Sequence, residues 1–406
     1  MQLKILILFL LAGYGWFLKA QNNDSTLAPI EIDFISSYYL QDGNKSPVTG
    51  GIGDEELSDE MNIIKLYLPA TKKVDFTFYG GVDHYTSAST DNINNEYDLY
   101  TETSASYSDK RFYGNLGVNY KFLKSKWILG INGGYSKEWD VKSINGGGFV
   151  SKLSKNENQS FKLSFSYFND TWDLIYPAEL RWKTFGGDEL LDVNVRKTMD
   201  VAFTFNSVID KRSNMGISIE STFLSGLLST PFHRVYFKDN ANHDIERLPN
   251  SRLKIPLAIM YNKYLTNFLI TKLYYRYYWD DFGIKAQTFN IELPTKIFKS
   301  IKLYPFYRYH TQTASKYFQP FGMHSYLDEY YTSDFDLGNT TSHKIGMGLK
   351  YAPLYGVFRF KNFIKKEQSL MLKKITIRGA KYYRLRGEEL ILKAFIITGQ
   401  FTFSIG

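Results

Sequence analysis

The sequence predicts a single closed antiparallel β-barrel of about sixteen strands that spans a membrane. Three observations predict it: apolar residues recur at every second position, tight polar turns alternate with long loops, and aromatic residues make up 17% of the chain. The alternating segments run roughly ten to fifteen residues, as tilted membrane-spanning strands do. Tyrosine and phenylalanine form girdles at both bilayer interfaces of such barrels. The segment boundaries leave a strand number of about fourteen to eighteen.

The N-terminus predicts a signal peptide over residues 1–20. Lys4 precedes an apolar run over 5–18, and Lys19 and Ala20 follow it. A basic start, a short apolar region and a small residue at the cleavage point are typical of such peptides, whereas a spanning helix needs ~20 apolar residues. We therefore expect a short segment at 21–29 and an outer-membrane barrel over 30–406. A buried N-terminal helix is the alternative.

Composition restricts the partners. The chain has no cysteine, so disulfides and thiolate metal ligands are excluded. Without Lys4 and Lys19, the 49 basic residues fall to 47 against 41 acidic ones, a net charge of +6. These charges are mixed along the chain, and no basic tail indicates nucleic acid. The expected partners are outer-membrane lipid and either a small anionic solute or another envelope protein.

The two-residue period runs through most of the chain. Its apolar members include Phe161, Leu163, Phe165, Val201, Phe203, Leu253, Ile255, Leu257, Ile259, Ile345, Met347 and Leu349. Short turns are predicted at 70–73, 123–126, 155–158, 211–214, 264–267 and 298–301, and long loops at 41–60, 87–109, 176–196, 229–250 and 319–341. Because bacterial barrels have short periplasmic turns and long external loops, we expect this orientation here. The connection 352–372 is longer than the rule allows, and a soluble β-sandwich is the alternative fold.

If the apolar sets face lipid, residues of the opposite parity face the lumen. That set is rich in cations in the later strands: Arg252, Lys254, Lys272, Arg276, Lys302, Arg308, Lys374, Arg378 and Arg384, with His310 in phase. Asp280 and Glu292 are the clearest acids there. A cationic wall selects anions, since rings of Lys or Arg favour them. The alternative is a lumen filled with side chains that neutralise one another.

Residues 42–60 form an unusual segment, DGNKSPVTGGIGDEELSDE. It lacks the Gly-Lys-Ser/Thr of a phosphate-binding loop, and Pro47 occupies the glycine position of a calcium loop. A weak calcium site from Asp42, Asn44, Asp54 and Glu55 is one hypothesis, although we expect no metal and no cofactor. We expect the segment to turn into the barrel mouth, so that its acids face the basic wall and form a constriction; a solvated outer loop is the alternative. The acids are Asp42, Asp54, Glu55, Glu56, Asp59 and Glu60.

The histidines do not form a catalytic pattern. His84 lies near Ser87, Ser89 and Asp91, which invites a serine-hydrolase interpretation, but residues of one strand end rarely make a triad. His324 with Asp328 and Glu329 has a metal-ligand spacing that matters only on a helix. We therefore predict no catalytic residues and no enzyme.

Four phrases resemble a known family. They are DGNKSPVTGGIGDEEL (42–57), YTSASTDNI (85–93), DTWDLIYPAELR (170–181) and YYTSDFDL (330–337). Together they resemble a family of outer-membrane β-barrel proteins classed as a domain of unknown function, over most of the chain after Glu31. The resemblance implies a barrel in a Gram-negative outer membrane and no settled activity. A site shared by the family would lie in the loops that carry these phrases.

These observations support three hypotheses for function. The first is a channel for small solutes, anionic ones in particular. The second is a non-transport binding platform, or an outer-membrane subunit for another exported protein. The third, with the least support, is a barrel hydrolase.

Overall fold

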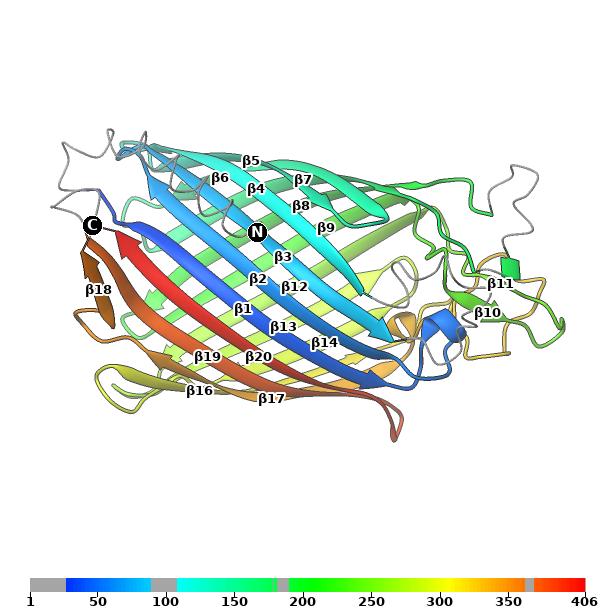
Figure 1. Ribbon diagram of the computed structural model, residues 1–406. Helices are drawn as coiled ribbons and strands as arrows, with labels where there is room; N and C mark the ends of the chain where they lie inside the picture. Colours follow the sequence, from blue (N-terminus) through cyan, green and yellow to red (C-terminus); the bar gives the residue numbers. More distant parts are fainter. Residues whose placement is uncertain (1–26, 89–107, 178, 181–189, 362–368, 406) are drawn as a thin grey trace.

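The computed structural model describes residues 27–88, 108–177, 179–180, 190–361 and 369–405. Within these residues, sixteen antiparallel strands close into one barrel, so the predicted fold class and strand number are confirmed (Figure 1). The strands of the wall are β1 (Ile30–Gly43), β2 (Glu56–Pro69), β3 (Val74–Ala88), β4 (Ser108–Phe122), β5 (Trp127–Lys137), β6 (Val141–Leu153), β7 (Gln159–Trp172), β8 (Val195–Asp210), β9 (Ser213–Gly226), β12 (Ser251–Tyr264), β13 (Ile270–Asp280), β14 (Lys285–Glu292), β16 (Ile301–Gln312), β17 (Thr340–Tyr351), β19 (Ser369–Arg386) and β20 (Glu389–Ile405).

Shorter elements complete the chain. β15 (Thr295–Lys296) continues the line of β14 along β16, and β18 (Phe358–Lys361) pairs with the start of β19. β10 (Arg234–Tyr236) and β11 (His243–Ile245) form a separate hairpin, and η1 (Pro47–Thr49) and η4 (Phe335–Leu337) are single 3₁₀ turns. Among the described residues, no helix has the length and apolarity to cross a membrane.

The barrel closes between its first and last strands. β1 pairs with β20 from Ile30↔Ile405 to Gly43↔Leu392, while its other edge pairs with β2. Closure satisfies the backbone groups that an open sheet edge would leave unpaired in lipid, where no water replaces them.

Side-chain alternation gives the wall an apolar outside. Ile131 is 71% exposed, Ile345 57% and Met347 55%, and large apolar residues are exposed on strands all around the ring. A closed barrel that presents such residues outward is stable only when lipid covers them. The chain is therefore an outer-membrane β-barrel.

The two ends of the barrel differ, as the loop lengths predicted. At the end that holds Ile30 and Ile405, called here the turn end, the connections are 70–73, 123–126, 154–158, 211–212, 265–269 and 297–300. The unusually long connection after β17 also lies there and contains β18 (Figure 1). The opposite end, the loop end, carries the long connections 44–55, 227–250 and 313–339, together with the short turns 138–140, 281–284 and 387–388.

The loops at the loop end pack together into a structure that we call the cap, formed by 44–55, 227–250 and 313–339 with the described parts of 173–194. The described residues contain three small apolar cores, and all three include cap residues. One joins Tyr176, Leu180 and Ile245, and a second joins Val235, Phe237 and Tyr331. The third, Phe318, Phe335 and Ile391, anchors the cap to β20.

The cap spans the mouth of the barrel. Loop 44–55 follows the first strand of the ring and loop 227–250 follows the ninth, so the two loops arise from opposite sides. They nevertheless meet, because Arg234 Nη1 donates a hydrogen bond to Val48 O at 2.7 Å. Gly50, with φ of 84°, lies so close to the Tyr236 ring that a Cβ would be 2.6 Å from it. A side chain at Gly50 would separate the two loops.

Candidate functional site

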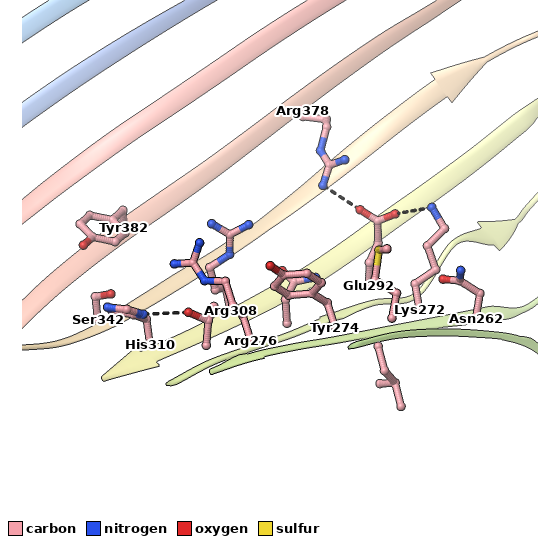
Figure 2. Close-up of a pocket in the computed structure, with 14 residues that line it drawn as sticks. Asn262, Lys272, Tyr274, Arg276, Glu292, Arg308, His310, Ser342, Arg378 and Tyr382 are labelled. Atoms are coloured by element: carbon pink, nitrogen blue, oxygen red, sulfur yellow. Dashed lines mark hydrogen bonds and ion pairs between the residues drawn. The ribbon is translucent and has the colours of Figure 1, made fainter. Parts of the chain in front are cut away.

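The clearest charged site of the lumen centres on Glu292 at the end of β14. Its carboxylate lies 3.0 Å from Lys272 Nζ and 2.8 Å from Arg378 Nη2, and so bridges two cations (Figure 2). Lys272 is its partner on the neighbouring strand β13, whereas Arg378 reaches it from β19, across β16 and β17. Gly348 of β17 leaves room for this reach, since a Cβ there would lie 3.0 Å from Arg378 Cγ. The Arg378 guanidinium also lies over the Phe306 ring, 4.6 Å from its centroid.

A lumen cavity of about 590 Å³ surrounds this bridge. Arg276 and Arg308 line it on the side of His310, whose Nδ1 is 2.8 Å from Thr288 Oγ1 (Figure 2). Neither arginine forms an ion pair within the described residues, and the buried Arg276 Nε has no hydrogen-bond partner there. The cavity lining thus combines one paired carboxylate with cations that are free to bind an anion.

The remaining cations of the predicted wall lie nearer the two ends of the lumen. Arg252 pairs with Asp280, which is fully buried and also accepts a hydrogen bond from Tyr278 at 2.8 Å. Arg384 binds Asp336 of the cap, with Nη1 2.6 Å from Oδ1. The rest of the set is placed by strand register. Lys254 lies opposite Asp280, Lys302 opposite Lys350, and Lys374 opposite Thr402. The wall is therefore neutralised in part at the loop end.

Sequence reasoning missed some cations of this wall, among them Lys344 and Lys350 of β17. Register places Lys344 opposite Arg308 and Lys350 opposite Lys302, so both share the lumen face. They alternate with Ile345, Met347 and Leu349, which the sequence pattern assigned to the lipid face. The residues between these three would have been assigned to the lumen by the same pattern.

The opposite wall holds a second cavity, of about 550 Å³, between β3 and β8. These strands lie about half the ring away from β13–β19. Its polar residues are mostly paired: Asn115 Nδ2 donates to Asn145 Oδ1 at 2.9 Å, and Arg196 Nη2 is 3.0 Å from Asp170 Oδ2. Arg196 also lies over the Trp172 ring, 5.1 Å from its centroid. This wall is more aromatic and closer to neutral than the wall around Glu292.

The acidic segment differs from the expected loop because the strands extend further. β1 continues to Gly43 and β2 begins at Glu56, so the connection covers 44–55. Strand parity then places Asp59 toward the lumen and Glu56 and Glu60 toward the outside. Asp42 also lies on the outer face, where it pairs with Lys393 at 2.8 Å. The expected group of six acids at the mouth is therefore not formed.

Asp54 and Glu55 remain in the connection, and Glu55 lies at the lumen mouth. A Cβ at Gly43, on the lumen face, would be 3.3 Å from Glu55 Oε2. Burial, reinforced by the nearby Asp336 carboxylate, raises the pKa of Glu55 from 4.5 to about 7, while Arg384 opposes this change. Asp42, Asn44, Asp54 and Glu55 do not share one ligand geometry, since Asp42 faces outward and Glu55 inward.

The structure places His324 in the packing of the cap and His84 on the outer face of the barrel. His324 is buried, with Nδ1 3.3 Å from Asp328 Oδ2 and Nε2 3.0 Å from Thr332 O, and so holds the cap loop together. Glu329 is exposed. His84 lies on the outer face of β3, opposite Glu60, while Ser89 and Asp91 lie outside the described residues.

The family-like phrases converge in the cap. Arg234 contacts three of them: it binds Val48 O, forms a two-pronged ion pair with Glu179, and accepts a hydrogen bond at its carbonyl from Ser333 Oγ at 2.7 Å. Burial alone would raise the pKa of Glu179, but the hydrogen bonds from His243 and Arg234 hold that pKa well below its usual value. Sequence reasoning could not find Arg234, because it lies outside all four phrases.

The chain is similar to one family model and, at low identity, to several solved structures. A family model described as "Protein of unknown function (DUF3570)" matches residues 81–356. No curated protein is significantly similar in sequence. The chain resembles a solved bacterial polysaccharide outer membrane secretin, at 9% identity, covering 93% of this chain and 98% of that chain, with a TM-score of 0.44.

Two further solved structures are similar at the same level. Acinetobacter baumannii OccAB1 has 10% identity, with 93% of this chain and 96% of that chain covered and a TM-score of 0.41. Pseudomonas aeruginosa OpdK, solved with vanillate, has 8% identity, with 92% and 98% covered and a TM-score of 0.42. At such low identities and TM-scores, these likenesses carry no information about what enters or binds this barrel.

Proposed function

This chain belongs to the DUF3570 family of unknown function, and we propose that it is an outer-membrane channel for small anionic solutes. The observation that carries the proposal is the pair Arg276 and Arg308, which line the lumen cavity beside the Glu292 bridge and have no acidic partner among the described residues. Cations on a pore wall attract anions and repel cations of the solution, so they set the selectivity. Lys344, opposite Arg308, extends the same positive surface.

The exposure of the neighbouring cations Lys272 and Arg378 favours passage of a solute over its permanent binding. The bridge around Glu292 is partly exposed, with Lys272 and Arg378 side chains 45% and 42% accessible. A passing carboxylate or phosphate can share the exposed side of either cation without displacing Glu292, whose side chain is only 12% accessible, and such a shared contact is weak. Conduction requires such weak, multiple sites.

Planar-bilayer recordings test this function. Purified wild-type barrel should form discrete channels whose reversal potential in a KCl gradient indicates preference for chloride. Arg276→Gln combined with Arg308→Gln should reduce the anion-to-cation permeability ratio, and the difference should shrink at high salt because ions screen the wall. Lys211→Gln, in an exposed turn at the turn end, is the matched control. Absence of conductance, or equal selectivity in both variants, would contradict the proposal.

Export by a signal peptide over residues 1–20 remains part of this proposal. Those residues lie outside the described part of the chain. Mass spectrometry of the protein from outer membranes should give a mature N-terminus at Gln21.

A second candidate, the binding platform, is favoured by one feature of the cap. Leu327 is 90% exposed, Met323 56% and Tyr326 55%, all within the loop 313–339. Exposed apolar groups on a water-facing loop are typical of a protein contact. After mild detergent extraction, an envelope protein that copurifies with wild-type barrel and is lost with Leu327→Asp would support this candidate, whereas bilayer conductance would be unaffected.

A further inference from the structure

Three ligand-type side chains meet inside the cap, away from the lumen cavities. His233 precedes β10 and Glu246 follows β11, and Glu246 N donates to His233 O at 2.8 Å to close the base of this hairpin. Asp334 comes from the other loop, 313–339, directly before η4. One ligand atom from each of the three residues lies within 4.8 Å of the other two.

The two carboxylates are held in place by neighbouring donors. Glu246 is 2% exposed and accepts hydrogen bonds from Thr230 N, at 2.7 Å, and from Thr332 Oγ1. Asp334 Oδ1 accepts from Asp336 N at 2.8 Å. A carboxylate offers about four lone-pair positions, so each retains acceptor capacity after these bonds. The side chains are fixed in position and still able to bind a further group.

The surroundings of His233 Nδ1 indicate what that further group is. Its side chain is 12% exposed, and Nδ1 is buried without a hydrogen-bond partner in the described part of the chain. Nδ1 lies 3.7 Å from Glu246 Oε2, which is too long for a hydrogen bond. Two ligands that each lie about 2.0–2.2 Å from one metal ion are separated by a distance of this size. Within the described segments this nitrogen has no hydrogen-bond partner, and a bound ion would supply one.

We propose that His233 Nδ1, Glu246 and Asp334 form a site for a divalent transition-metal cation such as Zn²⁺, with water completing the coordination. Imidazole and carboxylate ligands together suit this class of ion, and its charge would neutralise two carboxylates that share a buried region. The ion would join loop 227–250 to loop 313–339, and so fasten the cap across the mouth. This site is independent of the proposed channel function.

Zinc binding to the purified, folded barrel tests the site directly. After chelator treatment, titration with ZnCl₂ against a competing chromophoric chelator should show one saturable site in the wild type. His233→Gln should weaken it by more than about 100-fold, beyond the loss expected for outer-shell groups. The matched control is Glu138→Gln, in a second group of acids at the loop end, Asp109, Glu138 and Asp140. Tyr85 donates to Glu138 at 2.9 Å and Arg111 lies 3.6 Å from it, so this variant should bind zinc as the wild type does.

A second variant and a spectroscopic measurement guard against misfolding. Asp334→Asn retains Oδ1, which accepts from Asp336 N, and should also lose zinc; heat-modifiable mobility on gels reports that each barrel has folded. Zinc X-ray absorption of the wild type should show one imidazole nitrogen with oxygen ligands at about 2.0–2.2 Å. The proposal is overturned if the wild type has no saturable site, in which case a protonated His233 paired with Glu246 accounts for the cluster. Zinc affinity that His233→Gln and Asp334→Asn leave unchanged would overturn it equally.

Discussion

Arg378 Nη2 lies 2.8 Å from Glu292 Oε2, although β16 and β17 separate the strands that carry these residues. The contact follows the curved inner surface of the barrel and crosses Gly348, where a Cβ would lie 3.0 Å from Arg378 Cγ. Glu292 therefore partly neutralises the positive charge of both Lys272 and Arg378, in a region where the cavity lining is otherwise basic.

Replacing Glu292 with Gln should increase anion selectivity. The change frees Lys272 and Arg378 for solution anions, and the gain should diminish at high salt. Reversal potentials in a KCl gradient measure the effect, with Glu157→Gln at the turn end as the control, since Glu157 pairs with Lys126 outside the lumen. A shift toward cations would refute the assigned role.

Gly348→Leu should displace Arg378 from Glu292 and lower single-channel conductance. A Cβ at this position would lie 3.0 Å from Arg378 Cγ and 3.4 Å from Tyr304 Cβ, so a larger side chain must enter the lumen. Gly379→Leu is a matched control, because a Cβ there has no heavy atom within 4 Å. If Gly348→Leu conducted as the wild type and Gly379→Leu do, the role of Gly348 in leaving room for Arg378 would be contradicted.

Anion selectivity should fall as the pH rises through about 7, the raised pKa of Glu55. Below this pH the Glu55 carboxyl is neutral, and above it a negative charge appears near Arg384 and Asp336. Glu55→Gln should match the wild type at low pH and exceed its anion selectivity at high pH. The sign for stability is the same: a carboxyl with a raised folded-state pKa favours folding at low pH, and this contribution is lost between about pH 4.5 and 7. Identical pH profiles for wild type and variant would refute the role of Glu55.

Arginine on the outer surface should destabilise the barrel. Ile377 is 46% exposed on the apolar face of β19, and Ile377→Arg should cost about 2–4 kcal/mol if the site lies near the bilayer midplane. Lys254→Gln, on the lumen face, should be tolerated. Urea unfolding in lipid vesicles compares the two, and equal losses would contradict the assignment of faces.

The absence of native cysteine makes orientation directly measurable. Single cysteines at the exposed cap residue Asn242 and the exposed turn residue Arg212 should react differently with an impermeant maleimide in intact cells. Asn242→Cys should be labelled and Arg212→Cys protected, since long loops face outward in such barrels. Ser213 is unsuitable because it is 5% exposed. Labelling confined to Arg212→Cys would reverse the orientation.

The strand pattern was predictable because each barrel strand has one apolar and one polar face, and this period of two is visible without knowing the partners. Parity alone separated Arg276 and Arg308 from Ile377 and Leu257. The ends of the strands were harder to predict. β1 and β2 extend into the expected loop 41–60, so Asp42 and Glu60 belong to strands.

The cap could not be predicted in the same way. His233 and Asp334 are distant in sequence, and their approach depends on loops that fold against one another across the mouth. The phrases at 42–57 and 330–337 predicted which loops form the cap site, but no spacing within them reveals that Arg234 hydrogen-bonds to Val48 and Ser333.

The hydrogen bond between Arg234 and Val48 also predicts the order in which the barrel and the cap form. On a flat, unclosed sheet the loops that carry them would start about eight strand widths apart, roughly 38 Å at 4.7–4.9 Å per strand. Pairing of β1 with β20 removes this separation, so we expect the Arg234–Val48 contact, and with it the cap, to form once the barrel has closed. A chain arrested on its assembly machinery with that seam open would have completed hairpins but protease-sensitive loops. We therefore expect residues 44–55 and 227–250 to become resistant to an added protease only after β1 has paired with β20.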